Sequence, residues 1–295
     1  MDAKTTDKIF TSVLYIISTL VVLLLVALIG YLLFKGRGFF NPAFLFGNPR
    51  IGEEGGGIAP MLFNSFYMLA LSLLITIPLG VGAGIYLAEY AKEGPVINII
   101  RLSIETLSSL PSIVVGLFGL LVFVNMTKWG FTILSGALAI SVLNLPSLTR
   151  VSEDAIRNAA SGVKEASLGL GATNWQTISR VILPSAMPQI LTGVILASGR
   201  IFGEAAALMY TAGLSAPALH FENISLIDRS SPFSLFRPAE TLAVYIWKLN
   251  AEGIVPDAAD IANKASAVLI TMVLIFNISA RFIGKKIYEA YSGKK

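Results

Sequence analysis

The sequence predicts an all-α integral membrane protein with six transmembrane helices and a polar loop between the fourth and the fifth. Hydrophobic residues make up 55% of the chain and charged residues 14%, and the mean hydropathy is +0.73, all far from the averages of soluble proteins. Long apolar runs separated by polar segments produce this balance, and a helix satisfies the backbone hydrogen bonds of such a run inside a bilayer. We expect one transmembrane domain over residues 1–295.

Composition also narrows the class of function. The chain has no cysteine, which rules out disulfides, thiolate metal sites and cysteine catalysis, and it has a single histidine, His220. It contains no Gly-x-x-x-x-Gly-Lys-Ser/Thr phosphate loop, so it lacks the means to bind ATP in that way. The net charge of +4 implies no nucleic-acid partner. We therefore expect a non-catalytic membrane protein that binds no metal or cofactor itself.

The apolar runs differ in how well they match a membrane span. The first is about 26 residues long, more than a signal peptide contributes. The second contains Pro78 among glycines, which predicts a kinked helix packed closely inside a bundle. The third has only about 14 apolar residues after Ser112 and must borrow flanking residues to cross the bilayer. The six predicted spans are residues 9–34, 60–88, 111–126, 131–148, 190–212 and 265–283.

The distribution of basic residues predicts the orientation. With six spans, the two termini lie on the same side as the loops between spans two and three and between spans four and five. These segments carry 13 Lys and Arg residues, against 8 in the opposite three loops. The positive-inside rule therefore places both termini in the cytoplasm of a bacterial or archaeal plasma membrane.

Residues 150–188 form a cytosolic loop with helix signals of its own. Ser152, followed by two acids, is typical of an N-cap and predicts a helix that begins there. Thr173 and Gln176 match a capping box for another helix, which Pro184 should end. The pattern alone is compatible with an amphipathic hairpin on the bilayer surface or with a docking site for a partner protein.

A spaced motif in this loop favours docking. Its residues are Glu165, Ala166, Ser167, Gly171, Val181, Leu183 and Pro184. They resemble the EAA loop of ABC-importer permeases, in which Glu-Ala-Ala is followed by Gly and then by Ile-x-Leu-Pro, with Ser167 and Val181 as the two departures. The resemblance implies a MetI-like fold in which the helix before Gly171 is a coupling helix that inserts into a separate cytosolic ATPase, where ATP and Mg²⁺ bind.

Two charges in the fifth predicted span stand out. Arg200 and Glu204 are four residues apart, and a continuous helix would place them on one small, polar face with Gly193 and Ala197. An arginine at mid-helix costs about 3 kcal/mol to insert, so it needs a partner or a function. The pair could simply neutralise itself as a packing device. Alternatively, the guanidinium contacts a tetrahedral oxyanion in transit while the glutamate prevents tight binding.

Further motifs narrow the resemblance. They lie at residues 56–60, 78–90, 110–119 and 199–204. Together they resemble the A-type permease of phosphate-specific ABC importers. The resemblance implies a C-type permease as second subunit, two copies of the ATPase and an extracytoplasmic phosphate-binding protein. It also assigns pathway roles to Arg200 and Arg150, although Arg150 fits a positive-inside anchor equally well.

Two other functions remain compatible with these residues. One is a permease for another oxyanion such as sulfate, molybdate or phosphonate, because an Arg-Glu pair does not identify phosphate. The other is a structural or sensory membrane protein that docks a signalling partner through the same loop.

Overall fold

The computed structural model describes residues 3–50, 52–219, 221–253 and 255–292, so His220 lies outside them, and most of these residues are helical. The first half comprises α1 (Ala3–Lys35), α2 (Pro42–Phe46), α3 (Ala59–Ile85), η1 (Tyr86–Tyr90), α4 (Pro95–Ser108), α5 (Ser112–Gly119), η2 (Leu120–Met126) and α6 (Ile133–Ala160). The second half comprises α7 (Lys164–Gly169), α8 (Asn174–Thr177), η3 (Ile178–Ile182), α9 (Leu183–Gly203), α10 (Ala206–Met209), α11 (Leu242–Glu252) and α12 (Ala258–Ser292). The η segments are π-helical turns.

Five helices among the described residues are long and apolar enough to cross a membrane, and a bent pair raises the number to six if it counts as one span. The pair consists of α4 and the helix Ser112–Met126, which meet at 102°. This corrects the prediction of a simple third span over 111–126. That segment is helical, but at 15 residues it is too short to cross about 30 Å of hydrocarbon alone.

Helix α6 is the centre of the bundle. Its most apolar window is 67% buried, against 33% for α3 and for the helix Asn174–Gly203. Small residues allow this burial: a Cβ added to Gly80 of α3 would lie 3.1 Å from Leu148, and one added to Gly84 would lie 2.5 Å from Cβ of Ser152. Close packing of the second span is thus confirmed, although α3 continues as one helix through Pro78.

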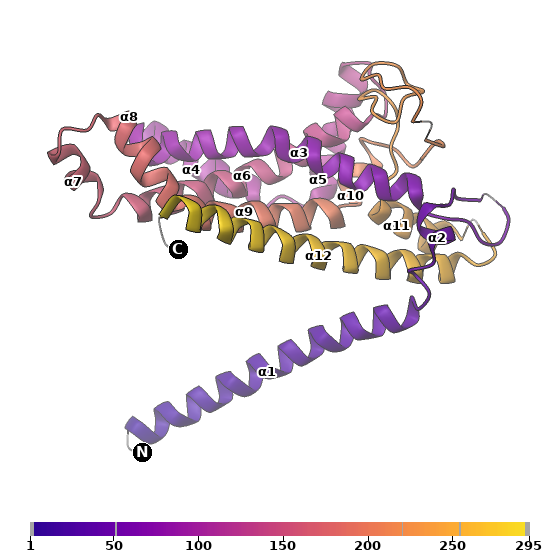
Figure 1. Cartoon of the computed structure of the whole chain (residues 1–295), viewed down its shortest axis with the longest axis horizontal. Helices are drawn as coiled ribbons and strands as arrows, with labels where there is room; N and C mark the ends of the chain where they lie inside the picture. The colour runs from indigo at the N-terminus through magenta and orange to yellow at the C-terminus, as the bar shows by residue number, and fades with distance from the viewer. Residues whose placement is uncertain (1–2, 51, 220, 254, 293–295) are drawn as a thin grey trace.

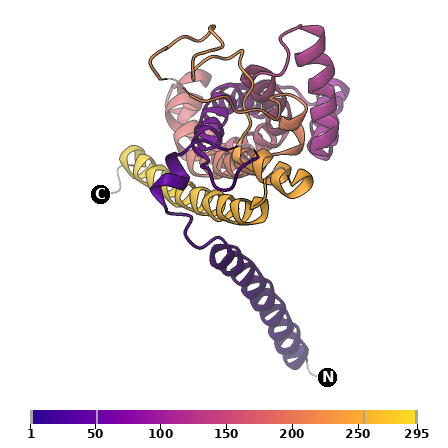
Figure 2. The ribbon, with the colours of Figure 1, turned by 90° about the vertical axis from the view of Figure 1, so that its right-hand side faces the viewer.

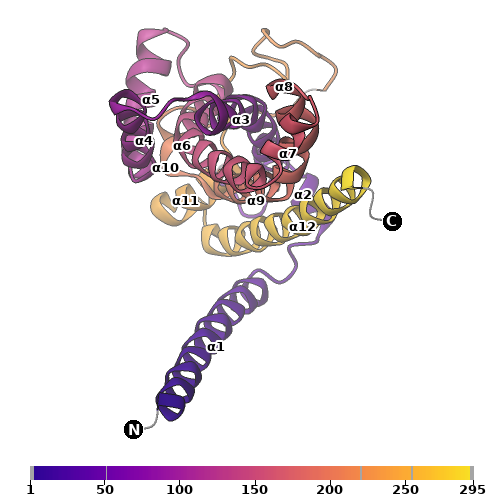
Figure 3. The same ribbon diagram turned by 90° about the vertical axis from the view of Figure 1, so that its left-hand side faces the viewer.

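Helix α1 leaves the bundle at an angle in all three views (Figures 1, 2 and 3). Its most apolar window has a mean hydropathy of 2.9 and is 0% buried, so nearly all of its surface is available to lipid or to another subunit. Its last turn meets α12, where a Cβ at Gly36 would lie 2.5 Å from that of Ala267.

The bundle has two distinct ends. We call the end that carries α7 the coupling end, and the opposite end, with α2, α11 and residues 213–241, the outer end (Figures 1 and 2). Both chain termini lie toward the coupling end (Figure 1). This agrees with an even number of membrane crossings. The part of α12 that carries Lys285 and Lys286 lies at the same end of the bundle as α7.

At the outer end, the loop 213–241 covers the start of α6. The amides of Ile133 and Leu134 donate to the carbonyls of Arg237 and Leu235, so the loop satisfies groups that a helix N-terminus leaves unpaired. The Arg237 side chain is 1% exposed and donates Nη2 to Oδ1 of Asn64 in α3 at 2.7 Å. The loop is thereby fixed to two spans.

Two predicted helix boundaries are wrong. Ser152 does not cap a helix: it is buried inside α6, which continues to Ala160, because its small side chain packs on Gly84. The coupling loop therefore begins near residue 161 and not at 150. Pro184 does not end a helix either, since the chain is helical from Asn174 to Gly203.

Candidate functional site: the coupling segment and Arg200

The tip of the coupling segment is α7, which contains Glu165, Ala166 and Ser167 and has no buried residue. Apolar side chains around it are also exposed: Leu170 is 91% exposed and Trp175 62%. An exposed apolar surface with an acidic neighbour is typical of a protein-protein contact. The sequence motif thus lies on the most accessible part of the coupling end, at the far left of Figure 1.

Gly171 makes the turn that follows α7. Its φ is +87°, a left-handed conformation that a side chain would disfavour, which explains why the motif has glycine there. After the turn, the predicted capping box is confirmed: Thr173 Oγ1 accepts the Gln176 amide, and the Gln176 side chain accepts the Thr173 amide at 2.9 Å. The Ser167 and Thr177 hydroxyls share a 2.9 Å hydrogen bond that joins α7 to the next helix.

Leu183 and Pro184 lie within a helix of 30 residues, Asn174–Gly203, which leads from the coupling loop into the bundle. Proline has no amide hydrogen to donate, so the helix needs an adjustment before it. The π-turn Ile178–Ile182 supplies one, with the Leu183 amide bonded to the Ile178 carbonyl. Leu183 packs against the core cluster around Ile156 and Ile182. These motif residues therefore keep the helix continuous and anchored.

An ion pair connects α7 to a second span. Lys164, the first residue of α7, places Nζ 2.7 Å from Oε2 of Glu89 in η1, the continuation of α3. The Glu89 side chain is 3% exposed, so this carboxylate is removed from water and depends on its partner. No local pattern indicates this contact, because the two residues are 75 positions apart, although Glu89 lies within the motif at residues 78–90 and Lys164 directly precedes the motif residue Glu165.

Glu153 organises a second group of charges nearby. Its Oε1 accepts a hydrogen bond from Arg101 of α4 and forms an ion pair with Arg157 of its own helix, each at 3.1 Å, and its side chain is 6% exposed. Glu93 completes the cluster, and hydrogen bonding from Arg101 lowers the pKa of Glu93. The acids after Ser152 were interpreted as helix-dipole partners, but Glu153 instead ties α4 to α6.

Arg200 and Glu204 do not form the predicted pair. Helix α9 ends at Gly203, and Glu204 has extended backbone angles. Its Oε1 accepts the amide of Ala207 at 3.1 Å, so it caps the short helix α10. Arg200 is exposed, and its side chain has no ion pair or hydrogen bond within the described residues. The predicted common face of Arg200 and Glu204 is therefore wrong, and the guanidinium is free to meet another molecule.

Arg150 lies within α6, ten residues before its end, and not at the cytosolic end of a span as predicted. It pairs with Asp154 on the next turn at 3.4 Å, and both side chains are about half exposed. Such exposed pairs contribute little to stability. Arg150 thus has a carboxylate neighbour, whereas Arg200 has none among the described residues. Within those residues no group of three or more potential metal ligands occurs.

Comparison with known proteins identifies the family. Residues 80–289 match the family "Binding-protein-dependent transport system inner membrane component". The chain is 52% identical over 289 residues to the "Probable ABC transporter permease protein YqgI" of Bacillus subtilis (strain 168), covering 98% of both chains. It is 31% identical over 238 residues to the "Phosphate transport system permease protein PstA" of Pasteurella multocida (strain Pm70), covering 81% of this chain and 79% of that protein.

Solved structures agree on the fold. A bacterial ABC transporter involved in the import of the acidic polysaccharide alginate matches with a TM-score of 0.58 at 15% identity, covering 97% of this chain and 98% of that one. An inward-facing MetNI methionine ABC transporter matches with a TM-score of 0.53 at 17% identity, over 80% and 94%. The MetI-like fold is therefore confirmed, and such a permease works with an ATPase and a binding protein. The chain belongs to the binding-protein-dependent transport system inner membrane components, as a non-catalytic, multi-pass permease subunit of an ABC importer.

Proposed function

We propose that this chain is the permease subunit of an ATP-driven importer of inorganic phosphate. The observation that carries the proposal is the unbroken helix Asn174–Gly203, which joins the exposed coupling segment at one end to the unpaired Arg200 at the other. Motion applied to the coupling loop reaches the cationic group through a single rigid element. Support for phosphate comes from PstA relatives, including one from Xylella fastidiosa (strain 9a5c) at 40% identity over 159 residues.

In this proposal α7 is the contact for a partner ATPase that binds ATP and Mg²⁺. Glu165 and Ala166 are exposed at the tip, with Leu170 and Trp175 as apolar neighbours. Burying exposed apolar side chains supplies binding energy, and the acid sets orientation. The coupling end, with both termini, faces the cytoplasm, and the outer end faces the phosphate-binding protein. A C-type permease completes the pathway opposite this subunit.

Arg200 supplies a transient anion contact. A guanidinium presents several N–H donors in one plane, which matches the oxygens of a tetrahedral oxyanion. With no carboxylate beside it, the cation attracts an anion more strongly than the predicted Arg-Glu pair would. Exposure to a water-filled pathway moderates that attraction and allows release.

Reconstitution tests the proposal. The chain, the ATPase, the second permease and the binding protein are placed in vesicles, and phosphate uptake is measured with sulfate, molybdate or a phosphonate as competitor. We expect ATP-dependent phosphate uptake that excess sulfate does not reduce. Uptake of sulfate or another oxyanion in preference to phosphate would assign the chain to that substrate instead.

A matched pair of variants tests the coupling contact. Glu165→Ala should lose co-purification with the ATPase, whereas Glu252→Ala removes an exposed acid at the outer end and should retain it. Equal retention by both variants would show that the ATPase binds elsewhere.

A further inference from the structure

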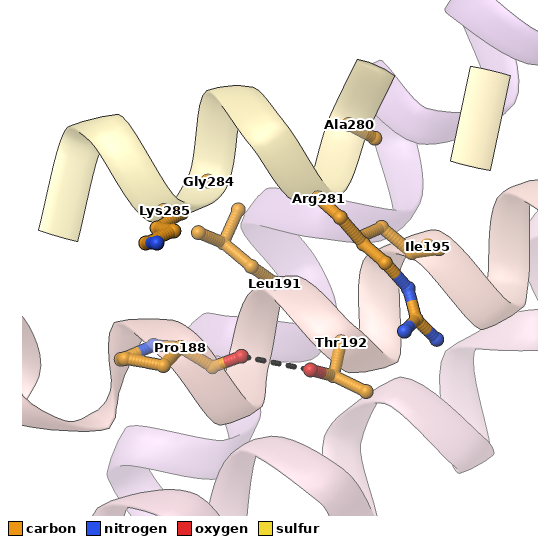
Figure 4. Close-up of a pocket in the computed structure, with 8 residues that line it drawn as sticks. All are labelled: Pro188, Leu191, Thr192, Ile195, Ala280, Arg281, Gly284 and Lys285. Atoms are coloured by element: carbon orange, nitrogen blue, oxygen red, sulfur yellow. Dashed lines mark hydrogen bonds between the residues drawn. The ribbon is translucent and has the colours of Figure 1, made fainter. Parts of the chain in front are cut away.

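A groove separates α9 and α12 in their coupling-end halves. It has a volume of about 400 Å³ and is lined by Pro188, Leu191, Thr192, Ile195, Ala280, Arg281, Gly284 and Lys285 (Figure 4). Gly284 brings the helices together at its floor, since an added Cβ would lie 3.1 Å from Leu191. The lining is mainly apolar, with two cations on the α12 side.

The two cations lack strong partners. Arg281 is exposed and has no ion pair or hydrogen bond in the described part of the chain, and its guanidinium extends toward α9 in Figure 4. The Lys285 ammonium is 3.7 Å from Glu289, and its side chain is 74% exposed. Thr192 is the only polar side chain that α9 contributes to the described lining of the groove, and it donates its hydroxyl to the Pro188 carbonyl at 2.9 Å. No acid in this lining therefore faces Arg281 from α9.

The groove is separate from the proposed anion pathway. Leu191 and Arg200 are nine residues apart on α9, about two and a half turns, so they lie on opposite sides of the helix. Arg281 also ends the run of 16 uncharged residues that begins at Ala265. A helical run of this length covers about 24 Å, so the long side chain of Arg281 can extend to the headgroup layer. The groove therefore combines an apolar wall with cations at headgroup depth, on the coupling end.

We propose that this groove binds the headgroup of an anionic phospholipid from the cytoplasmic leaflet. Arg281 and Lys285 bind the phosphodiester, and Leu191, Ile195 and Ala280 contact the glycerol and the first acyl carbons. Cations between membrane helices on the cytoplasmic side suit this ligand, and guanidinium matches phosphate oxygens in a bidentate manner. An apolar helix from another subunit would fill the groove but would leave Arg281 without a counter-charge.

Native mass spectrometry of the full chain in detergent tests the site, with phosphatidylglycerol and phosphatidylcholine as probes. The wild type should retain phosphatidylglycerol in preference. Arg281→Ala combined with Lys285→Ala should weaken its binding by at least about tenfold, because charge-assisted hydrogen bonds to phosphate are lost. Lys286→Ala is the control: this lysine stacks over Phe282 at 4.8 Å and does not line the groove. It should bind as the wild type does.

A second variant keeps both cations and fills the space. Thr192→Trp should also reduce phosphatidylglycerol binding, and it replaces the double variant if that one does not fold. Three results would overturn the proposal: unchanged binding in both groove variants, an equal loss in Lys286→Ala, or displacement of the lipid by millimolar inorganic phosphate. The last would assign the groove to the free anion. None of these results depends on whether the chain transports phosphate.

Discussion

Arg200 and Arg237 are both arginines in a strongly apolar chain, yet the fold uses them in opposite ways. Arg237 is 1% exposed and donates to the Pro232 carbonyl at 2.9 Å, to the Pro238 carbonyl at 3.2 Å and to Asn64 at 2.7 Å. Arg200 is exposed and has none of these contacts. Burial lowers the pKa of Arg237 to about 10, so it remains charged at neutral pH without a carboxylate. In this chain the buried Arg237 therefore holds the structure, whereas the exposed Arg200 is available to bind another molecule.

Replacing Arg200 gives the largest expected effect and tests one side of this contrast. Arg200→Gln should reduce phosphate uptake in the reconstituted importer to background, a loss of more than about a hundredfold, because the anion loses its cationic contact. Its melting temperature should equal that of the wild type, since no contact within the chain is lost. Wild-type uptake by this variant would show that Arg200 does not contact the anion. A large fall in melting temperature would show that Arg200, like Arg237, stabilises the fold.

Replacing Arg237 tests the other side. Arg237→Met should lower the free energy of unfolding by about 3 kcal/mol, because buried carbonyls and Oδ1 of Asn64 lose their donors. Thermal unfolding in detergent measures the change, with Arg229→Met at the exposed part of the same loop as control. A stable Arg237→Met chain would show that water can replace the guanidinium.

Glu240, which also lies at the outer end, makes the free energy of unfolding depend on pH. Its backbone carbonyl accepts Asn64 Nδ2 at 2.9 Å, and burial raises the pKa of its side chain from 4.5 to about 7, although Lys248 lies 3.3 Å away. The folded state thus holds this proton more tightly than the unfolded state. The stabilisation that comes from binding this proton is fully present below pH 4.5 and is lost as the pH rises through about 7.

Thermal unfolding from pH 5.5 to 7.5 measures this effect. Each pKa unit corresponds to about 1.4 kcal/mol, so the wild type should lose about 2 kcal/mol over this range. Glu240→Gln should remove that slope. An unchanged slope in the variant would show that another group causes the pH dependence. Arg237 would then be the buried ionisable group at the outer end that affects stability.

The smallest effect is expected at the coupling end. Lys164→Glu should reduce uptake per ATP hydrolysed by roughly fivefold, because it breaks a charge-assisted contact between α7 and η1. Exchanging both charges, Lys164→Glu with Glu89→Lys, should restore much of it. Failure of the exchange to rescue, with the ATPase still bound, would show that the contact has no part in coupling.

The sequence anticipated the features that depend on local chemistry. The capping box at Thr173 follows from side-chain preferences within a few residues. Within the part of the chain that the structure describes, five helices that can cross a membrane follow from the length of apolar runs, whereas the third predicted span is part of a bent pair. The motif around Glu165 likewise identified the exposed tip, because a docking segment needs its residues close together in the chain.

The sequence misled where tertiary contacts override local signals. Ser152 has the pattern of an N-cap, yet packing on Gly84 makes it part of a longer helix. Pro184 should end a helix, yet a π-turn before it lets the helix continue. Arg200 and Glu204 have helical spacing, yet α9 ends between them. For Ser152 packing outweighs a capping preference of about 1 kcal/mol, and for Pro184 a change in hydrogen bonding offsets a cost of about 3 kcal/mol.

By itself, the sequence determined that the chain is a helical membrane permease with an exposed polar loop between two of its spans, because hydropathy and a compact motif are properties of neighbouring residues. Only the tertiary structure decided which charged side chains have hydrogen-bond or ion-pair partners within the described residues and which have none. Arg237 is enclosed by segments 173 residues apart, Glu89 meets Lys164 across 75, and Arg200 and Arg281 are left without a partner in the described chain. Desolvation and pairing depend on what surrounds a charge in space, and that environment is assembled by folding.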